Sequence, residues 1–124
     1  MCFTDWDKIQ AEDVSWRYRR KVARGDNLAV AMVEVLRGAT TRPHRHENEE
    51  VILVLKGSWR FHLRGEEVTL GANQMLSIPP GVEHSSVVLE DTTAVDICTT
   101  ARPDWSTGED RALHYDPEQY LWAV

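Results

Sequence analysis

The chain has 124 residues, enough for one domain that buries a core without disulfide bonds. Its 14 Lys and Arg residues against 20 Asp and Glu residues give a formal net charge of −6, which disfavours nucleic acid and anionic membranes as partners. Two distant cysteines, no apolar run of membrane-spanning length and no signal-peptide pattern lead us to expect a cytoplasmic protein.

The first half of the chain alternates short apolar runs with turn residues, which is typical of an all-β sandwich or barrel. The basic stretch "RYRRK" at 17–21 is interpreted as a surface strand. The run "LAVAMVEVL" at 28–36 predicts a second strand. The run "VILVLKG" at 51–57 is continuous enough to predict a strand buried on both faces.

A hairpin is expected next, with "RGEE" as its turn. Because side chains alternate along a strand, Trp59, Phe61 and Leu63 should share the buried face. His62 then lies on the opposite face, towards solvent. We also expect His114, in the C-terminal tail, to be solvated.

The last part of the chain is expected to hold two strands and a tail. The runs "SSVVLE" and "TAVDICTT" predict strands at 85–90 and 93–100, joined by a turn at "ED", residues 90–91. From residue 104 the composition becomes polar with interspersed aromatic residues, and a short helical turn is expected at 109–113. The aromatic residues near the C-terminus should dock on the domain or on a second subunit.

Three histidines and a glutamate form the strongest chemical pattern. His44 and His46 are two residues apart, so their side chains point to the same side of a strand, and Glu50 follows at a short interval. His84 comes after the rigid turn "PPG". Neutral imidazoles with one carboxylate suit a divalent transition metal, and the sequence does not choose among Zn, Ni, Mn and Fe.

The spacing of these residues resembles the two sequence motifs of the cupin family. The first motif is matched by Gly38, His44, His46, Glu50 and Gly57, and the second by Gly71, Pro79, Gly81 and His84. The resemblance implies a jelly-roll barrel (a double-stranded β-helix) in a single domain, 1–124, with a core at about 15–103 and a tail at 104–124. It also implies a metal bound by His44, His46, Glu50 and His84, and a homodimer.

The stretches "RRKVARGDNLAVAMVEV" and "LEDTTAVDICTTARPDW" are similar to the small KdgF-type pectin-degradation cupins, which ketonise 4,5-unsaturated monouronates. The resemblance implies catalytic roles for Asp96 and Arg102, with the Arg102 guanidinium holding a substrate carboxylate. Trp59, Phe61 and Cys98 are expected to line the same pocket. Cys98 stands where that family has an aromatic residue, and Glu50 where it often has Gln, so a different substrate is an open alternative.

Three functions therefore remain open. The first is a redox-neutral lyase or isomerase acting on a small anionic sugar acid. The second is a non-haem iron dioxygenase or another tailoring enzyme of small-molecule metabolism. The third is a non-catalytic cupin that senses a small ligand. Asp96 and Arg102 favour the first function, with a purely structural ion pair between them as the competing explanation.

Overall fold

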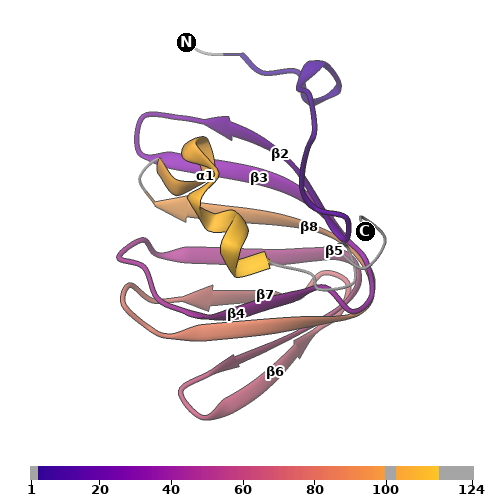
Figure 1. The fold of residues 1–124 in the computed structure, drawn as a ribbon, viewed down its shortest axis with the longest axis vertical. Helices are drawn as coiled ribbons and strands as arrows, with labels where there is room; N and C mark the ends of the chain where they lie inside the picture. The colour runs from indigo at the N-terminus through magenta and orange to yellow at the C-terminus, as the bar shows by residue number, and fades with distance from the viewer. Residues whose placement is uncertain (1–2, 100–102, 115–124) are drawn as a thin grey trace, which may run out of the picture.

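The computed structural model describes residues 3–99 and 103–114, and most of them lie in antiparallel strands (Figure 1). This confirms the predicted all-β fold. The strands are β1 (Glu12–Ser15), β2 (Tyr18–Arg24), β3 (Leu28–Val35), β4 (Thr40–His44), β5 (Glu50–Leu63), β6 (Glu66–Leu70), β7 (Met75–Ile78) and β8 (His84–Thr99). The helical elements are the 3-10 helix η1 (Trp6–Lys8), the α-helix α1 (Pro103–Thr107) and the 3-10 helix η2 (Glu109–His114).

One curled sheet contains all eight strands. Its main path runs β1-β2-β3-β8-β5-β6, while β4 pairs with β8 and β7 pairs with β5. The long strands β5 and β8 pair from Glu50 opposite Cys98 to Leu63 opposite His84. Within the described residues the outer strands β1 and β6 do not pair with each other, so the barrel is open (Figure 1).

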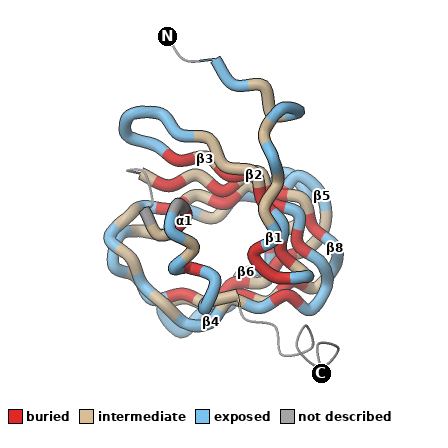
Figure 2. Tube along the Cα trace, turned by 45° about the horizontal axis from the view of Figure 1, so that its top comes forward, coloured by how far each residue is buried: buried red, intermediate tan, exposed pale blue. Residues whose placement is uncertain are grey.

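The core lies inside this barrel, as the buried segments of the strands in Figure 2 show. Alternate side chains of each strand point inward because successive side chains of a strand face opposite sides. Trp59 and Phe61 of β5 are buried, at 4% and 3% exposure. His62, the next residue, is exposed, as predicted. The turn between β5 and β6 forms at Arg64 and Gly65, both with positive φ, within the predicted "RGEE".

Two sequence-based predictions about the central strands are wrong. Residues 51–57 are not buried on both faces, since exposure alternates along β5 and Leu55 is 41% exposed. No turn forms at residues 90–91, because β8 continues through them. The register of the two strands shifts at this point, opposite Gly57 of β5. Gly57 has a φ of +110°, and an added Cβ would lie 2.3 Å from the Thr92 hydroxyl oxygen. The two strands bulge and bend here instead of turning back.

The basic stretch at 17–21 contributes to the predicted strand β2, but its predicted surface location is wrong for Arg20. The side chain of Arg20 is 1% exposed, whereas its neighbour Arg19 is exposed. Arg20 faces inward because it shares the parity of the buried Tyr18. A buried guanidinium needs a carboxylate partner, which the C-terminal segment supplies.

This C-terminal segment, α1 and η2, lies across the open side of the barrel (Figures 1 and 2). The helical turn predicted at 109–113 is confirmed by η2. The aromatic residues predicted to dock, at positions 115, 120 and 122, lie outside the described residues. None of the described helices is long and apolar enough to cross a membrane.

Candidate metal centre

Three strand ends bring the predicted ligands together. His44 is the last residue of β4 and pairs in register with His84, the first residue of β8. His46 follows two residues after His44, and Glu50 opens β5. The ring centroid of His44 lies 4.2 Å from that of His84 and 5.6 Å from that of His46, and the His46 and His84 centroids are 5.0 Å apart.

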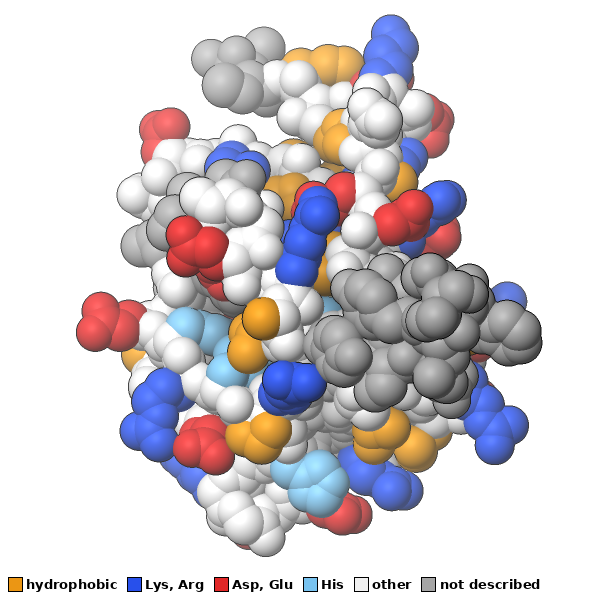
Figure 3. Space-filling view, viewed as in Figure 1, with side chains coloured by type: hydrophobic (Ala, Val, Ile, Leu, Met, Phe, Trp, Pro, Cys, Tyr) orange, Lys and Arg blue, Asp and Glu red, His pale blue; other side chains and the backbone are white. Residues whose placement is uncertain are grey.

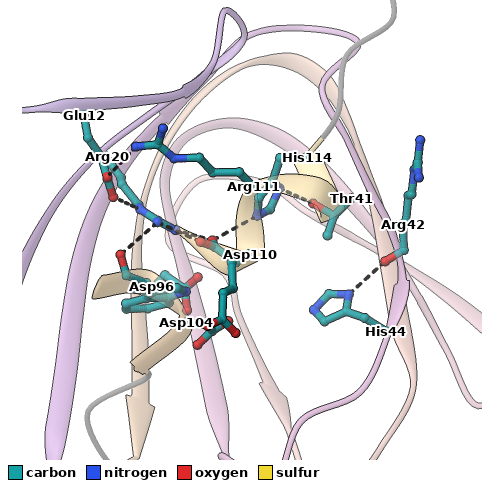
Figure 4. Close-up of polar contacts among 12 residues, drawn as sticks. Glu12, Arg20, Thr41, Arg42, His44, Asp96, Asp104, Asp110, Arg111 and His114 are labelled. Atoms are coloured by element: carbon teal, nitrogen blue, oxygen red, sulfur yellow. Dashed lines mark hydrogen bonds and ion pairs between the residues drawn. The ribbon is translucent and has the colours of Figure 1, made fainter. Parts of the chain in front are cut away.

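Main-chain carbonyl groups fix the orientation of all three imidazoles. In each ring Nδ1 is bonded to a carbonyl oxygen, so this nitrogen carries the proton and Nε2 is left with its lone pair. The acceptors are the oxygens of Arg42 for His44 (2.8 Å), Asn48 for His46 (2.9 Å) and Val82 for His84 (2.9 Å). One of these bonds, from His44 to Arg42, is drawn in Figure 4.

The carboxylate of Glu50 completes the set. Its Oε1 lies 3.4 Å from Nε2 of His46 and 3.3 Å from Nε2 of His84. Among the described residues the buried Nε2 of His46 has no hydrogen-bond partner, which is the arrangement expected of a metal ligand. Burial lowers the pKa of His44, and nearby His84 lowers it further, so His44 is held in its neutral, metal-binding form. The residues present therefore fit a divalent transition ion.

A small cavity of about 40 Å³ lies inside the barrel beside these ligands. His44, Glu50 and His84 line it, together with three residues predicted for the pocket, Asp96, Trp59 and Phe61. On the outside, a groove of about 270 Å³ runs between residues 44–46 and the C-terminal segment. Histidine side chains are visible on this face of the molecule in Figure 3.

Asp96 and Cys98 have the inward parity expected on β8. Asp96 is 5% exposed and lines the cavity, whereas the fully buried Cys98 is not among the described residues that do. The Cys98 thiol contacts Asp96 at 3.8 Å from Oδ1. A contact between Cys98 and substrate therefore stays a prediction. Arg102, the second predicted catalytic residue, lies outside the described residues.

The C-terminal segment contributes a wall of the cavity that the sequence did not reveal. Trp105, Leu113 and His114 all line it. The prediction that His114 is solvated is wrong, since its side chain is 11% exposed and its ring centroid lies 4.4 Å from that of Tyr18. The i, i+4 spacing of Asp110 and His114 was the one available signal, because such a pair shares a helix face.

A buried ion pair anchors this segment (Figure 4). Arg20 binds Asp110 through Nη1–Oδ2 at 2.5 Å and Nη2–Oδ1 at 3.0 Å, and its Nε bonds to Glu12 of β1. Burial would raise the pKa of Asp110, but hydrogen bonds from His114 and Arg20 outweigh burial and hold it well below its ordinary value. Asp110 is therefore ionised at neutral pH, and it joins the barrel to the wall of the cavity.

The open eight-stranded barrel and the cluster of three histidines and one glutamate are features of a cupin. The chain belongs to that family, since residues 31–99 match the model of the cupin domain. Within the family it resembles KdgF from Halomonas sp., at 29% identity and a TM-score of 0.77, over 84% of this chain and 99% of that one.

Two further solved structures share the fold. An RmlC-like cupin from Shewanella frigidimarina is 23% identical with a TM-score of 0.77, covering 83% of this chain and 94% of that one. A predicted oxalate decarboxylase from Thermotoga maritima is 16% identical with a TM-score of 0.69, covering 81% and 100%. No curated protein matches the chain. The fold class and the family resemblance predicted from the sequence are thus confirmed.

Proposed function

We propose that this cupin is a metal-dependent enzyme that carries out redox-neutral isomerase or lyase chemistry on a sugar acid, as in the ketonisation of 4,5-unsaturated uronates. The observation that carries the proposal is the position of Asp96, a buried carboxylate that lines the same cavity as His44, Glu50 and His84. The similarity to KdgF from Halomonas sp., which extends over nearly all of that chain, supports the same chemistry.

In this proposal His44, His46, Glu50 and His84 hold the metal. When bound, a divalent ion supplies Lewis acidity that stabilises negative charge on a substrate oxygen. Ketonisation moves one proton off an enol oxygen and adds one to the neighbouring carbon, so no electrons are gained or lost. Asp96 is proposed to transfer a proton at the reacting atoms, and Arg102 to bind the substrate carboxylate.

The test is turnover of a 4,5-unsaturated monouronate, followed by loss of its ultraviolet absorbance beyond the spontaneous rate. Protein reconstituted with Zn, Ni, Mn or Fe is compared with its Asp96→Asn variant. The variant keeps the shape of the side chain but loses the carboxyl group that can transfer a proton, so turnover should fall by roughly 10²- to 10⁴-fold with the metal retained. Asp26→Asn, at an exposed loop position, is the matched control. A metal-loaded wild type that is inert on uronates would refute the proposal.

The volume of the cavity favours a second candidate. About 40 Å³ has room for roughly three water molecules, far less than a uronate needs. A uronate would therefore require side chains that line the cavity to move, whereas a non-haem iron dioxygenase acting on a smaller acid would require less rearrangement. Oxygen uptake coupled one-to-one to product formation by the iron-loaded protein would establish the dioxygenase. Tight binding of a small acid without turnover under any metal would instead identify a sensor.

A homodimer and a cytoplasmic location are also proposed, on the family resemblance and the cysteine content. Trp16 is 47% exposed, and the guanidinium of Arg17 lies 3.9 Å from its ring centroid, so this corner of the barrel offers an aromatic contact surface. Light scattering of the purified protein gives the oligomeric state directly. A monomer at micromolar concentration would contradict the dimer.

A further inference from the structure

An ion pair and a hydrogen bond connect Asp110, His114 and Thr41 into a chain that ends in the cavity (Figure 4). Nε2 of His114 lies 3.6 Å from Oδ2 of Asp110, and Nδ1 lies 3.1 Å from the hydroxyl oxygen of Thr41. His114 and Thr41 come from η2 and β4, and both line the cavity that contains Asp96. A carboxylate, an imidazole and a hydroxyl in this order are the components of a proton relay.

The buried ion pair sets the direction in which the relay works. Asp110 is ionised and held by Arg20, so it acts only as an acceptor and draws the His114 proton to Nε2. Nδ1 then carries a lone pair and accepts the hydroxyl hydrogen of Thr41. As that hydrogen moves to His114, the Thr41 oxygen can accept a proton from a group in the cavity, and the imidazolium that forms is balanced by Asp110.

We propose that Asp110, His114 and Thr41 are this relay, a second proton-transfer group beside Asp96. The inference rests on the proposed isomerase function, and it assigns the two proton transfers of that reaction to two different groups. The relay takes the proton from the enol oxygen, while Asp96 in its protonated form gives a proton to the neighbouring carbon. The substrate is isomerised without redox change, and water carries the proton from His114 back to Asp96 between turnovers.

A purely structural role makes different demands on these residues. Packing at position 41 is equally served by valine, which has the same branched shape without a hydroxyl group. Stacking of His114 on Tyr18 requires a flat side chain but not a ring nitrogen in a particular protonation state. The relay, by contrast, requires the Thr41 hydroxyl and the His114 lone pair together.

The experiment is a double-mutant cycle of Thr41→Val and His114→Gln in the metal-loaded enzyme, assayed on the unsaturated uronate. Each single variant should lower kcat by roughly 100-fold with KM within about twofold, and the double variant should be no slower than either single one. Independent, additive losses, or losses confined to KM, would overturn the relay. Thermal unfolding of each variant verifies the fold, and His62→Gln, at an exposed histidine of β5, is the control.

A second measurement does not depend on turnover. Nitrogen-15 NMR of the histidine rings in zinc-loaded protein should show His114 neutral with its proton on Nε2. Thr41→Val should shift its Nδ1 resonance and leave His62 unchanged. A proton on Nδ1 of His114, donated to Thr41, would overturn the relay whatever the substrate. If the expected resonances appear in a protein that is inert on uronates, the relay stands and the proposed substrate is wrong.

Discussion

Replacing Asp110 by Asn tests whether the C-terminal segment is held by a buried charge. The change keeps the shape of the side chain and one acceptor oxygen but removes its negative charge. Arg20, 1% exposed, then loses its bidentate carboxylate partner in the interior, while its Nε still bonds to Glu12 and its Nη2 to the main-chain oxygen of Trp105. Breaking one side of a buried ion pair costs about 3–5 kcal/mol, because the remaining charge is buried without compensation.

We expect a loss of about 3 kcal/mol in the free energy of unfolding, at the low end of this range because Glu12 still neutralises part of the Arg20 charge. For a domain of this size the loss corresponds to a decrease of roughly 10 °C in the unfolding midpoint. Urea and thermal unfolding followed by tryptophan fluorescence measure both quantities, because Trp105 lies against Arg20.

The neighbouring pair Arg19–Asp13 provides a matched control. It has a contact of 3.0 Å between β2 and β1, but its side chains are 57% and 67% exposed. Asp13→Asn should leave the unfolding curve unchanged within error, since exposed ion pairs contribute little. If Asp110→Asn changed the free energy of unfolding as little as Asp13→Asn, the reasoning that a buried charge anchors the segment would be refuted.

Three further predictions address the metal, acid stability and the strand bulge. His46→Ala should retain less than about a tenth of the zinc bound by the wild type, as measured by elemental analysis. Because the pKa of Asp110 is held below its ordinary value of 3.8, the stability it contributes is complete at neutral pH and is lost as the pH falls below about 4. Urea unfolding from pH 7 to pH 3 should therefore bring wild type and Asp110→Asn closer together. Gly57→Ala should destabilise by at least about 2 kcal/mol, since its Cβ would meet Thr92 at 2.3 Å, whereas Gly25→Ala, with no atom within 4 Å, should be neutral in the same urea titration.

The candidate metal site could be predicted because its determinants are local. His44 and His46 share a face by strand parity, and the turn before His84 fixes where β8 begins. Such local spacing predicts the site even when the pairing of distant strands is unknown. The convergence of Glu50 with two of the histidines follows from the same motif.

The wall of the cavity could not be predicted, because its determinants are distant in sequence. Arg20 and Asp110 are 90 residues apart, and "RYRRK" alone does not show that the face shared by Tyr18 and Arg20 is the buried one. The segment of α1 and η2 is too short to show a helical period that would assign it a buried face. The turn predicted at residues 90–91 does not form for a related reason. The register shift near these residues is accommodated by Gly57, which is distant in sequence and lies on another strand.

The end-to-end pairing of β5 with β8 has a consequence for folding, in which the proposed uptake of zinc would act as a kinetic probe. Glu50 opens β5 and His84 opens β8, so in the antiparallel ladder they stand at opposite ends, beside Cys98 and Leu63. Oε1 of Glu50 nevertheless lies 3.3 Å from Nε2 of His84, because the two-stranded ribbon bends until its ends meet. A refolding chain with half of this ribbon paired holds an incomplete ligand set. If these residues bind zinc as proposed, tight binding should begin only when the ribbon has closed on itself, and its rate should report the last step of assembly rather than the first.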